Sequence, residues 1–317
     1  MKKVAIISNQ RTHSNIKNGN PVLVNLIDLL NKTKKIEVVG FTVKNLIPSY
    51  SQIIKIASFD ILHVHFGGLH CLFIFLLFPF KTKIVTFHGT DLHGSYGHKN
   101  FKNYIKKIIN KFISLFSIIL ANHVGLVSVS LKKYIIFSLF FNNKIFHNQL
   151  GVDYEKFYPL NKNNCKKIFE LKKEKKYFLF SSISSSKVKR FDLAKEMVSK
   201  LGSPFELVQL TGIKYLDVVK YINACHALII TSDNEGSPNI VRECLACNVP
   251  VFSFDVGDLK DLSKKGNGIY LIDRDPSSAI NIIKSKLDIA VDSRREFETI
   301  ISNSRVIKHQ LDFYNEL

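Results

Sequence analysis

The chain has 317 residues, of which 46% are hydrophobic and 22% charged, and its formal net charge is +19 at pH 7. This balance is typical of a globular protein and excludes a disordered or low-complexity chain. At about 150 residues per domain, the length predicts two domains. The positive charge fits nucleic acid, anionic lipid or phosphate-bearing ligands, or lysines spread over solvated faces.

Short β-rich segments alternate with segments of helical periodicity. The first half predicts strands at 4–7, 36–41, 61–65, 83–87 and 124–127, and helices at 21–30 and 101–120. The second half predicts strands at 177–180, 205–210, 227–231 and 249–254, and helices at 191–201, 216–224, 238–247 and 276–287. This alternation is typical of parallel sheets covered by helices, so we predict two doubly wound α/β domains facing each other across a cleft. The break is expected after Gly151-Val152-Asp153.

No segment predicts secretion or a membrane span. The five cysteines show no disulfide spacing, and only a short apolar stretch, Val4–Ile7, follows the basic Met1-Lys2-Lys3. The longest apolar run, Cys71–Phe80, is shorter than the about 20 residues that cross a bilayer. We therefore expect a reduced, cytoplasmic protein.

Two acidic residues, Glu235 and Glu243, frame the start of the predicted helix at 238–247. Ser237 is the predicted N-cap, Pro238 the first helical residue, and Asn248 a left-handed stop. Amides at the start of a helix bind anions, and carboxylates accept hydrogen bonds from vicinal hydroxyls. A nucleotide-sugar, with a diphosphate between two hydroxyl-rich sugars, has the matching anatomy.

This stretch resembles the donor-site motif of the family 4, group 1, retaining glycosyltransferases, which have the GT-B fold. The motif is Glu235-x7-Glu243, in which Glu235 lies within Ser-Asp-Asn-Glu-Gly-Ser-Pro-Asn. His88-Gly89-Thr90-Asp91 resembles the N-domain loop of the family, Gly151-Val152-Asp153 its hinge and Gly266-Asn267-Gly268 a late loop. The resemblance spans about residues 60 to 275. It implies transfer of a sugar from a nucleotide-diphosphate sugar to an acceptor hydroxyl with retention of configuration.

The resemblance also implies domains and roles. Residues 1–153, with about 303–317 crossing back, would bind the acceptor, and 154–302 the donor. The catalytic residues would be Glu235, Lys189 and His88. The donor-binding residues would be Lys187, Arg190, Gly236, Ser237, Pro238, Asn239 and Glu243. The acceptor-side residues would be Gly19, Asp91 and His65. We expect no metal and no cofactor besides the substrate, no nucleic acid partner, and a glycan or lipid-linked acceptor at the inner face of the cell membrane.

The chain departs from the family pattern at several positions. The arginine that usually precedes the diphosphate-binding lysine is missing near Ser184, and Lys187 is the nearest substitute. Asn248 and Asp258 replace usual glycines, and the glycine-rich N-terminal loop is reduced to Asn18-Gly19-Asn20-Pro21. Two alternatives therefore stay open: a non-catalytic partner subunit, and a GT-B sugar-nucleotide epimerase.

Three patterns imitate other sites. Asp273-Arg274-Asp275 resembles a metal motif of a different glycosyltransferase fold, but its place before Pro276 favours a helix cap. His63, His65 and His70 are either a metal cluster or histidines lining the cleft. Cys244-x-x-Cys247 is interpreted as core packing rather than a redox pair.

The predicted helix at 101–120 has an apolar stripe. The stripe consists of Phe101, Tyr104, Ile105, Ile108, Ile109, Phe112 and Ile113, and Lys102, Lys106, Lys107 and Lys111 lie off it. We interpret it as a core-packed helix with a solvated lysine face. The alternative is docking on anionic lipid.

Overall fold

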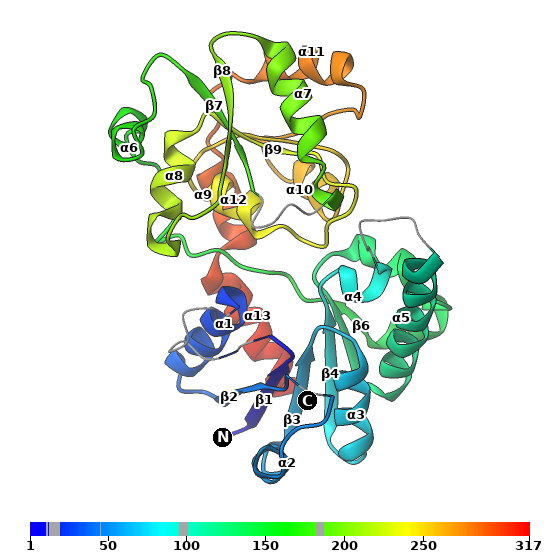
Figure 1. The fold of residues 1–317 in the computed structure, drawn as a ribbon. Coiled ribbons are helices and arrows are strands. Elements are labelled where there is room, and N and C mark those ends of the chain that lie inside the picture. Colours follow the sequence, from blue (N-terminus) through cyan, green and yellow to red (C-terminus); the bar gives the residue numbers. More distant parts are fainter. Residues whose placement is uncertain (11, 13–19, 45, 95–100, 182–186) are drawn as a thin grey trace. The chain divides into compact units, whose positions relative to one another are not determined.

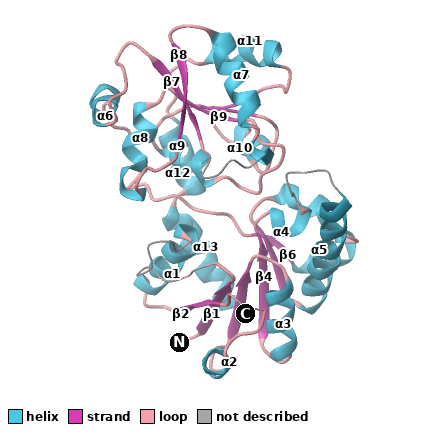
Figure 2. Cartoon of the chain, viewed as in Figure 1, coloured by secondary structure: helices cyan, strands magenta, loops and turns pink. Residues whose placement is uncertain are grey.

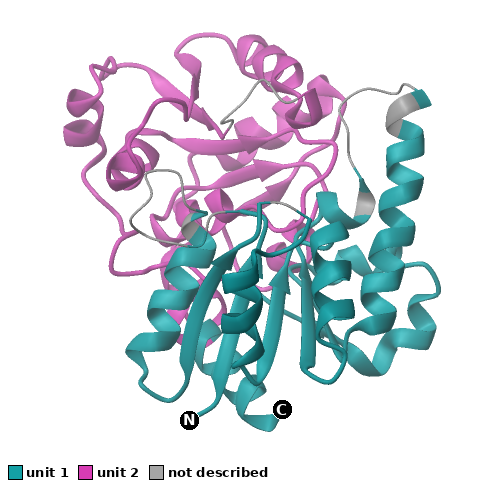
Figure 3. Ribbon diagram, turned by 60° about the horizontal axis from the view of Figure 1, so that its bottom comes forward, with its two compact units in different colours: residues 1–150, 306–317 teal, residues 151–305 magenta. Residues whose placement is uncertain are grey.

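The protein consists of two compact α/β units. The computed structural model describes all residues except 11, 13–19, 45, 95–100 and 182–186. The first unit comprises Met1–Leu150 and Val306–Leu317, and the second comprises Gly151–Arg305 (Figure 3). Each unit has one parallel sheet with helices packed around it (Figure 2). The predicted fold class, parallel sheets covered by helices, is confirmed.

The sheet of the first unit has the strand order β2-β1-β3-β4-β5-β6, and all its neighbouring strands are parallel. Its strands are β1 (Lys3–Ser8), β2 (Glu37–Thr42), β3 (Ile61–His65), β4 (Thr82–Phe87), β5 (His123–Leu126) and β6 (Ile145–His147). Its helices are α1 (Pro21–Lys32), α2 (Tyr50–Ala57), α3 (Leu69–Leu77), α4 (Thr90–His93), α5 (Phe101–Leu120) and most of α13 (Asn303–Glu316). Two 3₁₀ turns, η1 (Val129–Tyr134) and η2 (Ser138–Lys144), lie between β5 and β6.

Burial of apolar strands on both faces explains this layering, because parallel strands between helices have no wet face. One core cluster joins β1 and β2 to α1 and to Ile307, Leu311 and Tyr314 of α13. The other joins β3, β4 and β5 to α3 and to Ile118 of α5. Helix α13 is therefore a structural part of the first unit, although it follows the second unit in the chain (Figure 1).

The sheet of the second unit has the order β11-β10-β9-β7-β8, again parallel. Its strands are β7 (Lys176–Phe180), β8 (Phe205–Gln209), β9 (Ala227–Ile230), β10 (Val251–Ser253) and β11 (Ile269–Leu271). Its helices are α6 (Lys162–Ile168), α7 (Phe191–Leu201), α8 (Val218–Ala224), α9 (Asn239–Ala246), α10 (Leu259–Ser263), α11 (Pro276–Lys286) and α12 (Ser293–Ile301), with 3₁₀ turns η3 (Lys187–Lys189) and η4 (Tyr215–Asp217). One large apolar core joins them.

All the predicted strands and helices exist, within a few residues of their expected bounds. The prediction missed short elements, among them α2, α6, α12, β6 and β11. The apolar run Cys71–Phe80 is largely helix α3. Among the described residues, no helix combines the length and the apolar character needed to span a bilayer.

The interpretation of α5 as a core-packed helix is wrong for its apolar stripe. Phe101, Tyr104, Ile105, Ile108, Ile109 and Phe112 are between 38% and 78% exposed. The helix contacts its unit instead through Ser114, Ser117 and Ile118, which are nearly inaccessible. Small hydroxyl side chains fit that contact because each bonds a backbone carbonyl, Ser114 that of Asp91 and Ser117 that of Ile113.

Candidate functional site

The second unit brings two loops together where its sheet reverses its winding. In the order β11-β10-β9-β7-β8, the strands on the two sides of the β7–β9 pair are added in opposite directions. Loops that leave the carboxyl ends of such a pair diverge and create the usual ligand position of doubly wound sheets. The loop after β7 leads to Lys189, and the loop after β9 contains Glu235.

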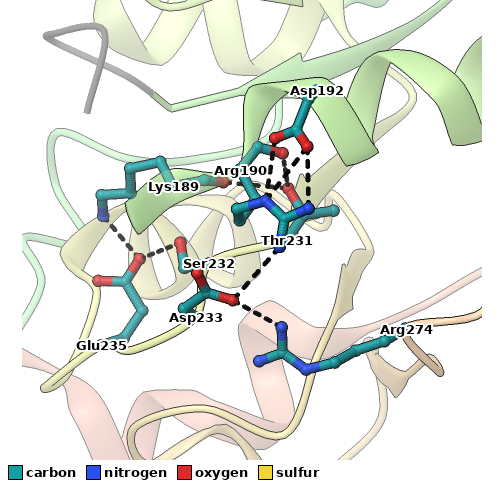
Figure 4. Close-up of polar contacts among 8 residues, drawn as sticks. All are labelled: Lys189, Arg190, Asp192, Thr231, Ser232, Asp233, Glu235 and Arg274. Carbon is teal, nitrogen blue, oxygen red and sulfur yellow. Dashed lines mark hydrogen bonds and ion pairs between the residues drawn. The ribbon is translucent and has the colours of Figure 1, made fainter. Parts of the chain in front are cut away.

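An ion pair joins these loops (Figure 4). Lys189 Nζ donates to Glu235 Oε1 at 2.6 Å, and Ser232 Oγ donates to the same oxygen at 2.6 Å. The Glu235 side chain is 11% exposed, whereas that of Lys189 is 34% exposed. Charge-assisted bonds of this kind are strong in a partly desolvated place. Two of the residues predicted to be catalytic therefore lie in contact.

Backbone bonds fix the position of Lys189. Thr231 Oγ1 donates to the carbonyls of Lys189 and Arg190 (Figure 4). The amide of Asp233 donates to the carbonyl of Val188 at 2.8 Å. Arg190 has φ 52°, a left-handed conformation that a non-glycine residue adopts only under constraint. The residues that follow β9 thus hold the loop of Lys189 next to the loop of Glu235.

A second cation near this loop, Arg274, was missed by the sequence analysis. Its Nη1 donates to Asp233 Oδ1 at 2.7 Å, and Arg190 Nη1 lies 3.7 Å from the same oxygen (Figure 4). Arg190 also binds both oxygens of Asp192. No spacing in the sequence connects position 274 with position 233, so only the fold reveals this contact.

The predicted helix cap at Asp273-Arg274-Asp275 is confirmed. Asp275 is the N-cap of α11 and accepts from the amide of Ser278 at 2.8 Å, and Pro276 is the first helical residue. Asp273 accepts from Ser278 Oγ. Both carboxylates are therefore occupied by the helix start.

A buried ion pair supports the loop between the two acids. Arg242 of α9, 0% exposed, pairs with Asp258 at the start of α10, and Asp258 also accepts from Ser237 Oγ at 2.9 Å. The prediction that Ser237 is the N-cap of α9 is therefore wrong. Pro238 occupies the N-cap position, without a side-chain bond. A Cβ on Gly257, which has φ 61°, would lie 2.5 Å from the carbonyl oxygen of Gly236, so only glycine permits this approach.

Glu243 lies inside α9 at the edge of the same site. Burial raises the pKa of Glu243 to about 7, and Lys156 opposes this rise. Lys156 Nζ lies 3.1 Å from the ring centre of Tyr215, whose pKa burial and the Glu243 charge raise to about 12. Lys156 and Tyr215 are two further residues beside Glu243 that the sequence did not indicate.

The end of α9 agrees with the prediction. Asn248 has φ 56° and is the left-handed residue that follows the helix. Its Oδ1 accepts from the amide of Arg294 at 2.7 Å. Asparagine in place of the usual glycine therefore ties α9 to the start of α12.

In the first unit, Asp91 holds together the two loops that follow β3 and β4. Its oxygens accept from the amides of Gly67 at 3.0 Å, His88 at 3.1 Å and Gly89 at 2.8 Å. Burial raises the pKa of Asp91 to about 6, against the lowering effect of these amides. The carboxylate is thus occupied by backbone donors.

His88 belongs to a chain of neutral histidines. Its Nε2 lies 3.0 Å from His65 Nδ1, its ring is stacked on Phe66 at 4.1 Å, and burial lowers its pKa to about 3. The other nitrogen of His65, Nε2, is buried without a partner in the described part of the chain. An unpaired buried N–H costs more than an unpaired acceptor, so we place the His65 proton on Nδ1. His88 then carries its proton on Nδ1, where it can donate to a ligand.

His63 has a separate, structural set of partners. Its Nδ1 lies 2.6 Å from the hydroxyl of Tyr314 in α13, and its Nε2 lies 2.7 Å from Thr86 Oγ1. Within the described ranges, no three His, Cys, Asp or Glu side chains are grouped so that they could hold a metal ion. Cys244 and Cys247 are buried in the core of the second unit, which confirms their predicted packing role.

The remaining residues named in the sequence analysis lie at the start of α9, on η3, or outside the described residues. Gly236, Pro238 and Asn239 form the turn into α9, and the Asn239 Oδ1 atom is buried with no partner among the described residues. Lys187 is exposed on η3, in the same turn as Lys189. Gly19 and Ser184 lie outside the described residues.

Comparison with known proteins finds one family profile that matches part of the chain. Residues 176–288, which contain Lys189, Glu235 and Glu243, match the profile of the group 1 glycosyl transferases. The matched residues all lie in the second unit. No curated protein sequence matches the chain.

Solved structures extend the likeness to the whole chain. Sucrose-phosphate synthase from Thermosynechococcus elongatus has a TM-score of 0.79 at 12% identity, and the match covers 100% of this chain and 99% of that chain. HepE from Anabaena in complex with UDP has a TM-score of 0.75 at 12% identity, with both chains covered in full. The lipopolysaccharide outer core galactosyltransferase WaaB has a TM-score of 0.67 at 14% identity, with 99% of this chain and 100% of that chain covered. The GT-B fold expected from the resemblance is confirmed.

Proposed function

We propose that this protein is a retaining glycosyltransferase that moves a hexose from a nucleoside diphosphate to an acceptor hydroxyl. The second unit binds the donor and the first unit binds the acceptor. The observation that carries the proposal is the Lys189–Glu235 ion pair at the reversal point of the second sheet, with Glu243 further along α9. A cation for the diphosphate and two carboxylates for sugar hydroxyls are thus held on one rigid frame.

Each side chain has a distinct role in this proposal. Glu235 accepts hydrogen bonds from hydroxyls of the transferred sugar, and Glu243 from the ribose hydroxyls. The amides from Gly236 to Asn239 face the sugar and the diphosphate, because the first amides of a helix have no partner within it.

Lys189 stabilises the leaving diphosphate, supported by Lys187 and Arg190. Breaking the bond between the anomeric carbon and the phosphate oxygen moves negative charge onto the diphosphate, so a nearby cation is worth most in the transition state. In the free protein Lys189 is held by Glu235 at 2.6 Å. Bound diphosphate competes for this ammonium group and leaves Glu235 available to the sugar. With lysines in this role we expect turnover to persist in EDTA.

On the acceptor side, His88 offers a neutral Nδ1–H to the sugar, and His65 acts through it. Neutrality is useful there because a neutral imidazole donates a hydrogen bond without attracting anions. Asp91 positions the loop, since its oxygens are already occupied by amides. Gly19 completes this side in the proposal.

UDP-glucose is the first donor to test, because HepE has been solved with UDP-glucose and shares the fold of this chain. The acceptor is proposed to be a growing cell-surface glycan or a lipid-linked glycan at the inner face of the membrane. WaaB, which acts on lipopolysaccharide outer core, supports this class of acceptor.

The test is release of UDP from UDP-sugars in the presence of lipid-linked acceptors. Lys189→Ala is expected to lower kcat by roughly 10²–10³-fold with a smaller effect on donor affinity. Lys195→Ala, an exposed lysine on α7, is the matched control and keeps normal turnover. Normal turnover in Lys189→Ala would place the diphosphate elsewhere.

Calorimetric titration separates the two carboxylates. Glu243→Ala is expected to weaken binding of free UDP by about 1.5–3 kcal/mol. Glu235→Ala spares free UDP and weakens only the UDP-sugar. Equal losses for free UDP in both variants would contradict the assigned roles.

One observation favours a second candidate, the non-catalytic partner subunit. The usual arginine is missing near Ser184, and Arg190 and Arg274 both lie against Asp233. Such a subunit binds UDP weakly and shows no turnover with any donor. A sugar-nucleotide epimerase, in contrast, converts its donor without an acceptor.

A further inference from the structure

Helix α5 exposes an apolar face on the side opposite to its contact with the first unit. At about 100° of rotation per residue, Ser114, Ser117 and Ile118 share one side of the helix. The exposed apolar residues gather on the other side, and they are Phe101, Tyr104, Ile105, Ile108, Ile109, Phe112, Phe116 and Ile119. A helix whose apolar face covered the core would have the reverse arrangement. An exposed apolar stripe of this extent marks a surface that another phase or molecule covers.

Lysines border this face on both sides. By the same rotation, Lys106 lies along one border and Lys111 along the other, whereas Lys107 falls on the contact side, next to Gly94. Lys106 is exposed and Lys111 is half-buried. Long lysine stems can extend beside an apolar stripe and place their ammonium groups at the level of lipid phosphates.

The surrounding chain contains almost no negative charge. From Ile61 to Val152 there are ten lysines and a single acidic residue, Asp91, whose oxygens are bound by backbone amides. Most of the exposed large hydrophobic side chains among the described residues also belong to this unit, including Leu76 and Phe80 beside the end of α3 and Phe140 in η2. Apolar and cationic groups thus gather on one unit.

We propose that α5 docks on an anionic bilayer surface, with its apolar stripe among the lipid headgroups and its bordering lysines on the phosphates. Apolar burial and attraction between lysines and acidic lipids add in this arrangement. A second copy of the chain fits less well, because two such faces would bring lysines together with no acid on either α5 to pair them. The inference goes beyond the proposed transfer reaction and stands without it.

The experiment is co-sedimentation of the full chain with vesicles of phosphatidylcholine alone and with added phosphatidylglycerol, with neither donor nor acceptor present. We expect binding to the phosphatidylglycerol vesicles that weakens as salt rises, and little binding to phosphatidylcholine. Absence of binding to phosphatidylglycerol at low salt would overturn the proposal, whatever the outcome of the turnover assays.

Two variants locate the surface. The apolar variant Ile105→Ser/Ile108→Ser/Phe112→Ser and the charge variant Lys106→Gln/Lys111→Gln are each expected to lower the vesicle partition coefficient by roughly tenfold or more. The substituted apolar residues are exposed in the free protein, so the thermal midpoint is expected to stay near that of the wild type.

Matched controls come from the second unit. Ile168→Ser/Ile289→Ser changes exposed apolar residues, and Lys264→Gln/Lys284→Gln removes the same charge as the charge variant from exposed positions. Both controls are expected to bind vesicles like the wild type. If the charge variant and its control lose vesicle binding equally, net charge alone explains the binding, and the proposed docking surface is wrong. Self-association that the apolar variant abolishes, without vesicle binding, would assign the face to a second copy instead.

Discussion

Glu243 is a carboxyl group whose ionisation changes near neutral pH. Burial raises its pKa from 4.5 to about 7. A group with a raised pKa in the folded state stabilises the fold most below its unfolded pKa, and loses that contribution as pH rises through the folded value. Removal of its charge is therefore expected to stabilise the protein at high pH and to have little effect below pH 4.5.

The pH dependence of UDP binding tests its ribose role. Hydroxyls that donate to the carboxylate favour its ionised form, so affinity for UDP is expected to rise with pH until about pH 7 and then to level off. Calorimetric titration across this range measures the effect.

Glu243→Gln supplies the control for this titration. The phosphates of UDP also titrate, at about pH 6, and in the variant only this titration changes the affinity with pH. The difference between the two affinity profiles therefore reports the ionisation of Glu243. Parallel profiles for wild type and variant would remove Glu243 from the nucleotide site.

The sequence indicated individual residues when local spacing placed them on one strand–loop–helix unit. Glu235, Glu243 and Asn248 were placed correctly along the chain for this reason. Lys156, Tyr215 and Arg274 were not found, because they reach the site from segments whose positions depend on the assembled sheet. Ser237 was misassigned as an N-cap because its partner, Asp258, lies on another element.

At the scale of elements, α9 and α10 are linked by the buried Arg242–Asp258 pair. The Arg242 atoms Nε and Nη1 and the Asp258 atom Oδ1 are buried without partners in the described part of the chain. A buried pair with unsatisfied atoms contributes little net stability, yet loss of one member leaves an uncompensated charge. The pair therefore constrains the loop at Ser237 more than it stabilises the fold.

Arg242→Met is expected to lower the free energy of unfolding by about 3–5 kcal/mol, because Asp258 stays buried and unpaired. Arg242→Met/Asp258→Asn is expected to recover most of this loss, since the amide oxygen still accepts from Ser237. Chemical denaturation measures both. Arg295→Met, at an exposed position, is expected to stay within about 0.5 kcal/mol of wild type. A double variant no more stable than the single one would show that the charge itself is needed.

Helix α5 shows the limit of prediction from periodicity. The stripe at 101–113 predicted the helix and its bounds correctly, but assigned its apolar face to the core. Periodicity reports only that one face is apolar and is silent about what covers that face. The buried side of α5 uses Ser114 and Ser117, which no hydrophobicity pattern marks as core.

At the scale of the whole molecule, α13 completes the unit in which the chain begins. Tyr314 is 0% exposed and its hydroxyl lies 2.6 Å from His63 Nδ1, in the core that includes Val4 and Ile6. The alternation of strands and helices predicted both sheets. It contains no information on which unit the last helix joins, and that expectation came from the family resemblance.

Leu311→Ala is expected to destabilise the first unit by about 2–5 kcal/mol through loss of buried contacts. Tyr314→Phe leaves the Nδ1 atom of His63 without its partner, at a cost of about 1–3 kcal/mol. Hydrogen exchange should show lost protection in β1 and β3, with α9 and β9 unchanged. The exposed Lys308→Ala is the matched control. Uniform loss of protection across both sheets would mean that the two units unfold together.

The position of α13 also determines the order in which the protein can fold during synthesis. The first sheet leaves the ribosome early, but Ile307, Leu311 and Tyr314 follow only after all of Gly151–Arg305 has been made. Until then one face of that sheet lacks part of its cover, and His63 lacks a bonding partner. The second unit, continuous in the chain, closes its core without waiting for distant segments. The first unit of the nascent chain therefore stays incomplete, and open to chaperones, throughout the synthesis of Gly151–Arg305.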